Sequence, residues 1–133
     1  MTGAVPIPWL QLALVALGGA LGSVARFLGS GAMHRLFPGL AFPVGTLAVN
    51  VAGSLVIGLI GGLAEGRQFL VPDLRVFLLT GVLGGFTTFS AFAFESLGLG
   101  LDGAWTRLVL NVGAQLLLGL GAAWAGYGLG RAL

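Results

Sequence analysis

The sequence predicts an all-α integral membrane protein in which one domain, residues 1–133, contributes four transmembrane helices. Two observations predict this fold. Of the 133 residues, 57% are hydrophobic and only 8% are charged, whereas a soluble domain carries roughly 25% charged residues. The apolar residues also form four runs long enough to cross a bilayer, which takes about 20 residues per helix. So few charged side chains cannot cover a water-facing surface, and we therefore expect the chain to lie among membrane lipids.

Turn signals bound the predicted helices. A breaker at Pro8 precedes the first helix, a Phe-Pro pair ending at Pro43 precedes the second, and Asp73 is suited to cap the start of the third. The expected helices span residues 10–29, 44–64, 74–97 and 105–129. The loops between them are short and hold nearly all of the charge. No linker or second domain is predicted.

Arginine is distributed almost evenly between the two ends of the predicted bundle. Orientation normally follows the bias of lysine and arginine between loops. One side carries three arginines and the opposite side two, namely Arg67, Arg75 and Arg131 against Arg35 and Arg107. Either the chain has too few charges to count, or it inserts in both orientations and pairs antiparallel with itself. The arginine count leaves both interpretations open.

The composition argues against several functional classes. The chain has no cysteine, so it forms no disulfide and offers no thiolate to a metal. Its net charge is only +2 and its arginines form no cluster, which argues against a nucleic-acid partner. The single histidine, His34, falls in a predicted loop without an acid–base partner on the helices. We therefore expect no enzymatic activity.

Polar residues on the first two helices are candidates for a functional site, because such groups are costly inside a membrane. Arg26 lies late in the first helix, where it either snorkels to the headgroups or draws anions into a vestibule. Thr46, Asn50 and Ser54 recur at intervals of four residues and share one face of the second helix. The Asn50 carboxamide offers donors and an acceptor, either for a bond between helices or for an ion path.

The fourth helix repeats this arrangement with Asn111 and Gln115, which are again four residues apart. A polar stripe at membrane depth has to face protein or water. Two such stripes on different helices indicate a lined path rather than one isolated hydrogen bond.

The third helix contains a sequence that is poor for a continuous helix. Gly84 and Gly85 are followed by Thr87 and Thr88, and both glycine and β-branched residues disfavour helix. A break near the middle of this helix would free backbone carbonyls at membrane depth, where broken helices commonly coordinate ions. The alternative is a bent but continuous helix whose threonines bond to the preceding turn.

A row of aromatic rings follows the expected break. Phe86, Phe89 and Phe92 recur at intervals of three residues and alternate with hydroxyl residues such as Ser90. Such a row commonly serves packing or faces lipid, but an aromatic ring also has a positive edge that can meet a small anion. Glu95 ends the run near the expected membrane interface, either as an interfacial acid or as part of a site.

These segments resemble the Fluc/CrcB family of fluoride channels over nearly the whole chain. The resemblance rests on residues 18–26, on residues 45–54 around Asn50, and on residues 84–92 with Glu95 beyond them. The third stretch is the most specific. The resemblance implies a fluoride-selective channel that exports fluoride passively across the cytoplasmic (inner) membrane of a prokaryote and so relieves fluoride toxicity.

The same resemblance implies an assembly and a set of ligands. The working unit would be an antiparallel, dual-topology homodimer with two pores. The backbone carbonyls of Gly84 and Thr87, at the break, would hold a structural sodium ion at the dimer centre. The family pattern further implies roles for Phe89, Phe92, Asn50, Thr88, Ser90 and Asn111 around the pore, for Arg26 in the vestibule and for Glu95 beyond the rings. Asn111 and Gln115 depart from the small hydroxyl residues expected on the fourth helix.

The residue types also suit fluoride conduction independently of the resemblance. Neutral amide and hydroxyl donors with weakly positive ring edges replace hydration water without trapping the ion, as conduction requires. A competing hypothesis is a small, dimeric, proton-coupled exporter of organic cations, in which Glu95 would exchange protons for cations. A third is a membrane scaffold that transports nothing.

Overall fold

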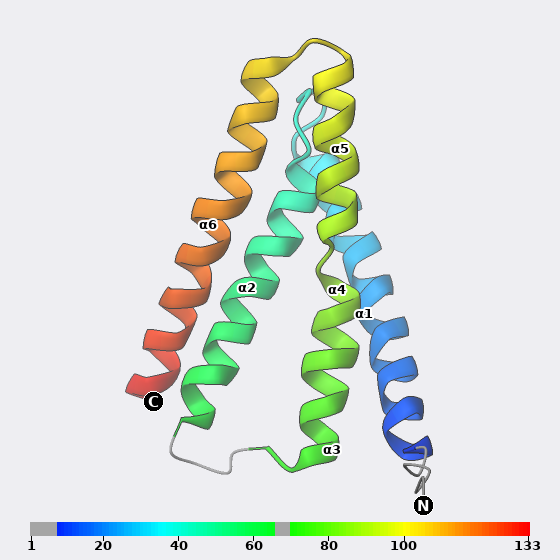
Figure 1. The fold of residues 1–133 in the computed structure, drawn as a ribbon, viewed down its shortest axis with the longest axis vertical. Coiled ribbons are helices and arrows are strands. Elements are labelled where there is room, and N and C mark those ends of the chain that lie inside the picture. Colours follow the sequence, from blue (N-terminus) through cyan, green and yellow to red (C-terminus); the bar gives the residue numbers. More distant parts are fainter. Residues whose placement is uncertain (1–7, 66–69) are drawn as a thin grey trace, which may run out of the picture.

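The computed structural model describes residues 8–65 and 70–133, and every regular element in this part of the chain is helical. The elements are α1 (Trp9–Leu36), α2 (Val44–Ala64), α3 (Pro72–Arg75), the π-helical η1 (Val76–Leu83), α4 (Gly84–Phe86), α5 (Phe89–Leu101) and α6 (Trp105–Ala132). Segments α3 to α5 follow one another as a single span (Figure 1). The described residues thus contain four helices long and apolar enough to cross a membrane, as predicted.

The four spans run lengthwise between two opposite ends of the molecule (Figure 1). The ends of α2 and α6 and the starts of α1 and α3 lie at one end, and the α1–α2 and α5–α6 turns lie at the other. Arg75 and Arg131 therefore lie near the first end, and Arg35 and Arg107 near the second. Arg67 falls outside the described residues. These four arginines are thus divided two and two between the ends, and Arg26 lies within α1.

Three spans extend further than hydropathy predicts. α1 continues past residue 29 to Leu36, and its last turn carries His34 and Arg35, which are favourable at a helix C-terminus. The third span ends at Leu101 instead of residue 97, and α6 ends at Ala132 instead of residue 129. The third span also begins earlier, at Pro72, because the fixed φ of proline suits the first helical position. The expected Asp73 cap is therefore wrong, since Val71 occupies that position.

Glycines bring the helices into backbone contact. α1 packs on η1 and α4, and a Cβ atom added to Gly22 would collide with backbone atoms of Val82 and Phe86. α2 packs on α6 in the same way, where a Cβ on Gly58 would collide with the Ala123 carbonyl. Small residues at helix interfaces allow this close approach. Most large apolar side chains of the described residues consequently remain on the outside, where lipid or another protein surface can cover them.

The third span is interrupted at the position that the sequence predicts. Thr87 and Thr88 both have extended backbone angles, with ψ of 156° and 114°. The Thr88 hydroxyl then caps α5 by accepting from the Ala91 N–H at 3.2 Å. The Thr87 hydroxyl donates to the Leu83 carbonyl at 3.0 Å, which is the bond expected for a continuous helix. The bond is present, but the helix is not continuous.

Candidate functional site

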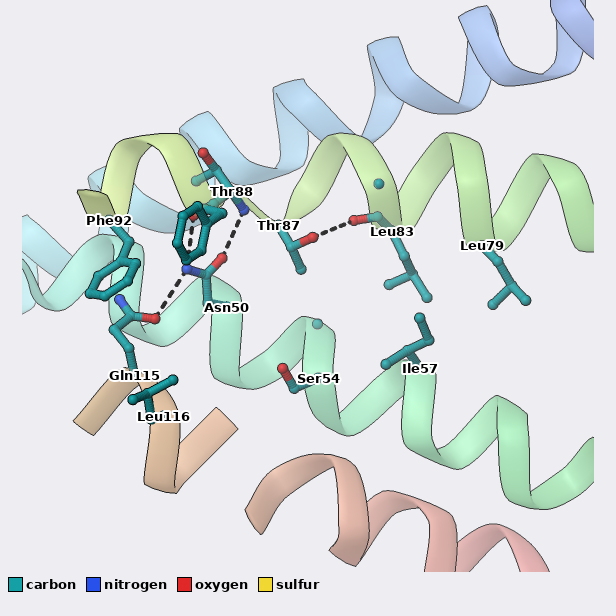
Figure 2. A pocket seen from close by; sticks show the side chains of 13 residues that line it. Asn50, Ser54, Ile57, Leu79, Leu83, Thr87, Thr88, Phe92, Gln115 and Leu116 are labelled. Carbon is teal, nitrogen blue, oxygen red and sulfur yellow. Dashed lines mark hydrogen bonds between the residues drawn. The ribbon is translucent and has the colours of Figure 1, made fainter. Parts of the chain in front are cut away.

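Asn50 on α2 pairs with the backbone of the interruption. Its Oδ1 accepts from the Thr88 N–H at 2.8 Å, and its Nδ2 donates to the Thr88 carbonyl at 3.0 Å (Figure 2). The first bond replaces the helical partner of the Thr88 N–H, which an extended residue at membrane depth requires. The second bond gives the Thr88 carbonyl a side-chain donor, although as the N-cap of α5 this carbonyl also accepts the first bond of that helix. Nδ2 also donates to Gln115 Oε1 on α6 at 3.1 Å. Three spans therefore meet at one side chain.

The same hydrogen bonds release two backbone carbonyls. In a continuous helix the Thr88 N–H would bond to the Gly84 carbonyl and the Ala91 N–H to the Thr87 carbonyl. Here the Thr88 N–H bonds to Asn50 and the Ala91 N–H to the Thr88 hydroxyl. The carbonyls of Gly84 and Thr87 thus lose their helical donors. Carbonyls freed in this way at a broken membrane helix are suitable ligands for a small cation.

A cavity of about 360 Å³ adjoins the interruption. Its lining comes from α2, the third span and α6, and includes Asn50, Ser54, Thr87, Thr88, Phe89, Phe92 and Gln115 (Figure 2). The full lining contains no charged side chain among the described residues. Amides, hydroxyls and aromatic rings therefore provide its polar character.

The two rings in this cavity form an edge-to-face pair. The ring centroids of Phe89 and Phe92 are 5.4 Å apart and the ring planes meet at 70°. Phe92 is half-buried, whereas Phe89 is 77% exposed on the surface of the chain. In an edge-to-face pair one ring presents its positive edge to the other, so the remaining ring edges are available to a ligand.

A second cavity, of about 620 Å³, lies on the α1 side of the interruption. Arg26, Arg35 and Glu95 line it, and Thr88 lines both cavities. The Thr46 hydroxyl donates to Glu95 Oε1 at 2.6 Å. Because Thr88 belongs to both linings, the charged cavity and the uncharged cavity meet at the interruption.

The remaining predicted site residues fall in three different places. Asn111 is fully buried and donates from Nδ2 to Ser96 Oγ at 3.0 Å, a bond between α6 and α5. It lines neither of these two cavities, in contrast to the sequence expectation. Ser90 is exposed, with its hydroxyl 3.3 Å from that of Thr88. Gln115, whose role the sequence leaves open, lines the uncharged cavity, and its place in the polar stripe of the fourth helix is the feature of the sequence that indicates this.

The fold and the site together define a multi-pass helical membrane protein with a polar, uncharged cavity at a broken helix. A family model described as CrcB-like protein, Camphor Resistance (CrcB), matches residues 13–127. The chain therefore belongs to the CrcB family, as its sequence motifs predict.

Curated relatives from several bacteria align over most of the chain. A fluoride-specific ion channel FluC from Nitratidesulfovibrio vulgaris (strain Miyazaki F) is 53% identical over 91% of this chain and 97% of its own length. The proteins of that name from Maridesulfovibrio salexigens and Agrobacterium fabrum are 46% and 45% identical, over 88% and 93% of this chain and 92% and 98% of their own lengths. These relatives are ion channels and not enzymes.

Proposed function

We propose that the chain is a fluoride-selective channel that lets fluoride leave the cell passively across the bacterial cytoplasmic membrane. The observation that carries this proposal is the uncharged cavity at the helix break, lined by two phenylalanine rings, in a protein whose relatives are named fluoride-specific ion channels. Export by this route would relieve fluoride toxicity. The ion would pass the vestibule beside Arg26 and then the cavity that contains Phe89 and Phe92.

The chemistry of the cavity suits a small, strongly hydrated anion. A pore has to replace the hydration shell with donors that are individually weak enough to release the ion. Amide and hydroxyl groups and aromatic edges meet this requirement, whereas a cationic side chain in the constriction would hold the ion too firmly. The two arginines lie in the other cavity, where a positive potential raises the local anion concentration without trapping the ion.

An antiparallel homodimer is supported by the face that carries the interruption. Gly84, Phe89 and Ser90 are all exposed on a single subunit. Freed carbonyls and hydroxyls do not face hydrocarbon without partners, so a second copy of the chain covers this face. The balance of arginines between the two ends supports insertion in both orientations. Two opposed copies would build two pores.

A structural sodium ion suits the freed carbonyls of Gly84 and Thr87. Sodium is a hard cation that prefers neutral oxygen ligands at a membrane helix break. Two carbonyls from each copy would hold it at the dimer centre, where it supplies a positive charge and ties the two breaks together. Because the carbonyl ligands are neutral, the site would hold no uncompensated anionic ligand within the membrane when sodium is absent.

Glu95 does not favour the alternative of a proton-coupled cation exporter. Its carboxylate is hydrogen-bonded to Thr46 and shares a cavity with Arg26 and Arg35. Arginine charges near a carboxylate oppose the entry of an organic cation. The relatives, which are channels, also favour conduction over exchange.

Ion efflux from liposomes that contain the purified protein tests the proposed function. We expect fluoride to leave rapidly and chloride to stay inside, with no need for a proton gradient. Removal of sodium from both sides should lower the fluoride efflux, because the dimer centre loses its ion. Chloride efflux at the fluoride rate, or transport that collapses with the proton gradient, would contradict the proposal.

A further inference from the structure

A mostly apolar groove lies between α2 and α6, at the end of the molecule that carries the α1–α2 and α5–α6 turns (Figure 1). It encloses about 640 Å³. Its apolar lining consists of Leu40, Ala41, Phe42, Leu47, Leu110 and Ala114, and its one charged lining residue is Arg107. None of these residues belongs to the third span, so the groove is separate from the helix break and its cavity.

The groove follows α6 from its first turn toward the middle of the span. Arg107, Leu110 and Ala114 recur at intervals of three and four residues and therefore share one face of α6. Seven residues of an α-helix rise about 10 Å, so the groove is long enough for part of an acyl chain. Lipid tails are as apolar as leucine, however, and the groove alone gives no preference for one lipid over another. Any preference has to come from the charged rim.

The guanidinium of Arg107 at this rim has unpaired donors. It carries five N–H donors, and the bond from Nη1 to the Ala41 carbonyl, at 2.9 Å, is the only hydrogen bond of this side chain within residues 8–65 and 70–133. No carboxylate of these residues forms an ion pair with it. Arg107 also lies in the first turn of α6, where the helix dipole disfavours a cation. A phosphate group at this position would accept from the guanidinium and offset the unfavourable dipole.

A smaller cavity, of about 320 Å³, shares Ala41, Phe42 and Arg107 with the groove. Its lining adds the carboxylates of Glu95 and Asp102. Asp102 is exposed at the α5–α6 turn and forms no ion pair within the described chain. A headgroup at this rim would therefore meet one cation and two carboxylates. This charge pattern favours a headgroup with both a phosphate and an ammonium group over one that carries a phosphate alone.

We propose that the groove binds a zwitterionic phospholipid with a primary ammonium headgroup, phosphatidylethanolamine. Its phosphate accepts from Arg107, its ammonium group lies toward Asp102, and one acyl chain lies along Leu110 and Ala114. The charge-assisted bonds to the phosphate supply the affinity, since the acyl chain is as well solvated by neighbouring lipid as by the groove. The carboxylates supply the selectivity for this headgroup.

Three substitutions separate the parts of this site. Arg107→Gln removes the charge that holds the phosphate, and Leu110→Trp fills the groove. We expect each to retain about tenfold less lipid, the scale of one hydrogen bond to a charged partner. Asp102→Asn should still retain lipid, but with a lower preference for phosphatidylethanolamine over phosphatidylglycerol. Arg75→Gln is the matched control, because it also removes one arginine, lies at the opposite end and lines neither the groove nor the smaller cavity.

Native mass spectrometry of the purified protein, mixed with equal amounts of the two lipids with identical acyl chains, counts the lipids that each variant retains. The melting temperature of each variant reports its folding. The inference is supported if the wild type and Arg75→Gln retain phosphatidylethanolamine over phosphatidylglycerol and Arg107→Gln loses it at an unchanged melting temperature. Equal retention by Arg107→Gln and the wild type overturns the inference, and so does a wild type that retains neither lipid or prefers phosphatidylglycerol. If Arg107→Gln does not fold, Asp102→Asn decides, because an unchanged ratio of the two lipids in that variant overturns the inference.

Discussion

At the scale of single residues, the donor and acceptor of one peptide group determine the orientation of two side-chain amides in succession. Thr88 is extended, and its N–H and carbonyl both bond to Asn50, whose remaining donor bonds to Gln115. Each of these amides has its orientation determined by the group before it. A helix break usually exposes polar backbone that has to be satisfied. Here part of that requirement is met by side chains, and the last of them, Gln115, keeps a buried Nε2 group without a hydrogen-bond partner among the described residues.

The two rings of the uncharged cavity give a test at this scale. Phe89→Ile and Phe92→Ile keep an apolar side chain and remove the aromatic edge, so we expect each to slow fluoride efflux about tenfold, the factor that corresponds to ~1.4 kcal/mol. Phe94→Ile is the matched control, because Phe94 is 76% exposed on the same helix and lines neither of these two cavities. Efflux from liposomes, normalised to folded protein, is the measurement. An equal loss in all three variants would mean that the rings serve packing alone.

At the scale of elements, the hydropathy pattern predicts the four spans and the Gly84-Gly85 and Thr87-Thr88 pairs predict the interruption. The sequence does not determine how the helices cross. Asn111 and Gln115 lie four residues apart on α6, yet Asn111 is fully buried against Ser96 and Gln115 reaches the cavity. Their shared helical face is visible in the sequence, but the neighbour of each turn of α6 depends on tertiary packing. For the same reason the sequence leaves open whether Asn50 bonds to another helix or lines an ion path.

The close approach of α1 to the third span is testable with two glycines that lie three residues apart on α1. Gly22→Ala would place a methyl group against backbone atoms of Val82 and Phe86, which cannot turn aside as a side chain can. We expect it to destabilise the protein by about 1–3 kcal/mol, as overpacking usually does, and to lower the melting temperature in detergent. Gly19→Ala points into open space and should be close to neutral. If both variants melted like the wild type, the contact of α1 with η1 and α4 would be looser than described.

At the scale of the whole molecule, a single subunit leaves its functional face open. Gly84, Phe89 and Ser90 are exposed and Thr87 and Thr88 are half-buried. The chain already packs α1 on η1 and α2 on α6 through backbone contact. Glycine interfaces of this kind bury little apolar surface, so much of the outer surface remains for lipid and for a second copy. The sequence indicates a second copy of the chain only through the balance of its arginines, because an interface between identical chains leaves no separate signal in one sequence.

Dual topology is testable because the chain has no cysteine of its own. Leu101 and Leu133 are apolar, 78% and 76% exposed, and lie at opposite ends of the molecule (Figure 1). Leu101→Cys and Leu133→Cys each introduce one thiol without changing the arginine balance that sets orientation. In intact cells, a membrane-impermeant maleimide should label about half of the molecules in either variant, since each antiparallel dimer presents one copy of each end to the outside. Labelling after the membrane is opened gives the total. Nearly complete labelling of one variant and none of the other would establish a single orientation, and the two breaks could then not face each other across an antiparallel dimer.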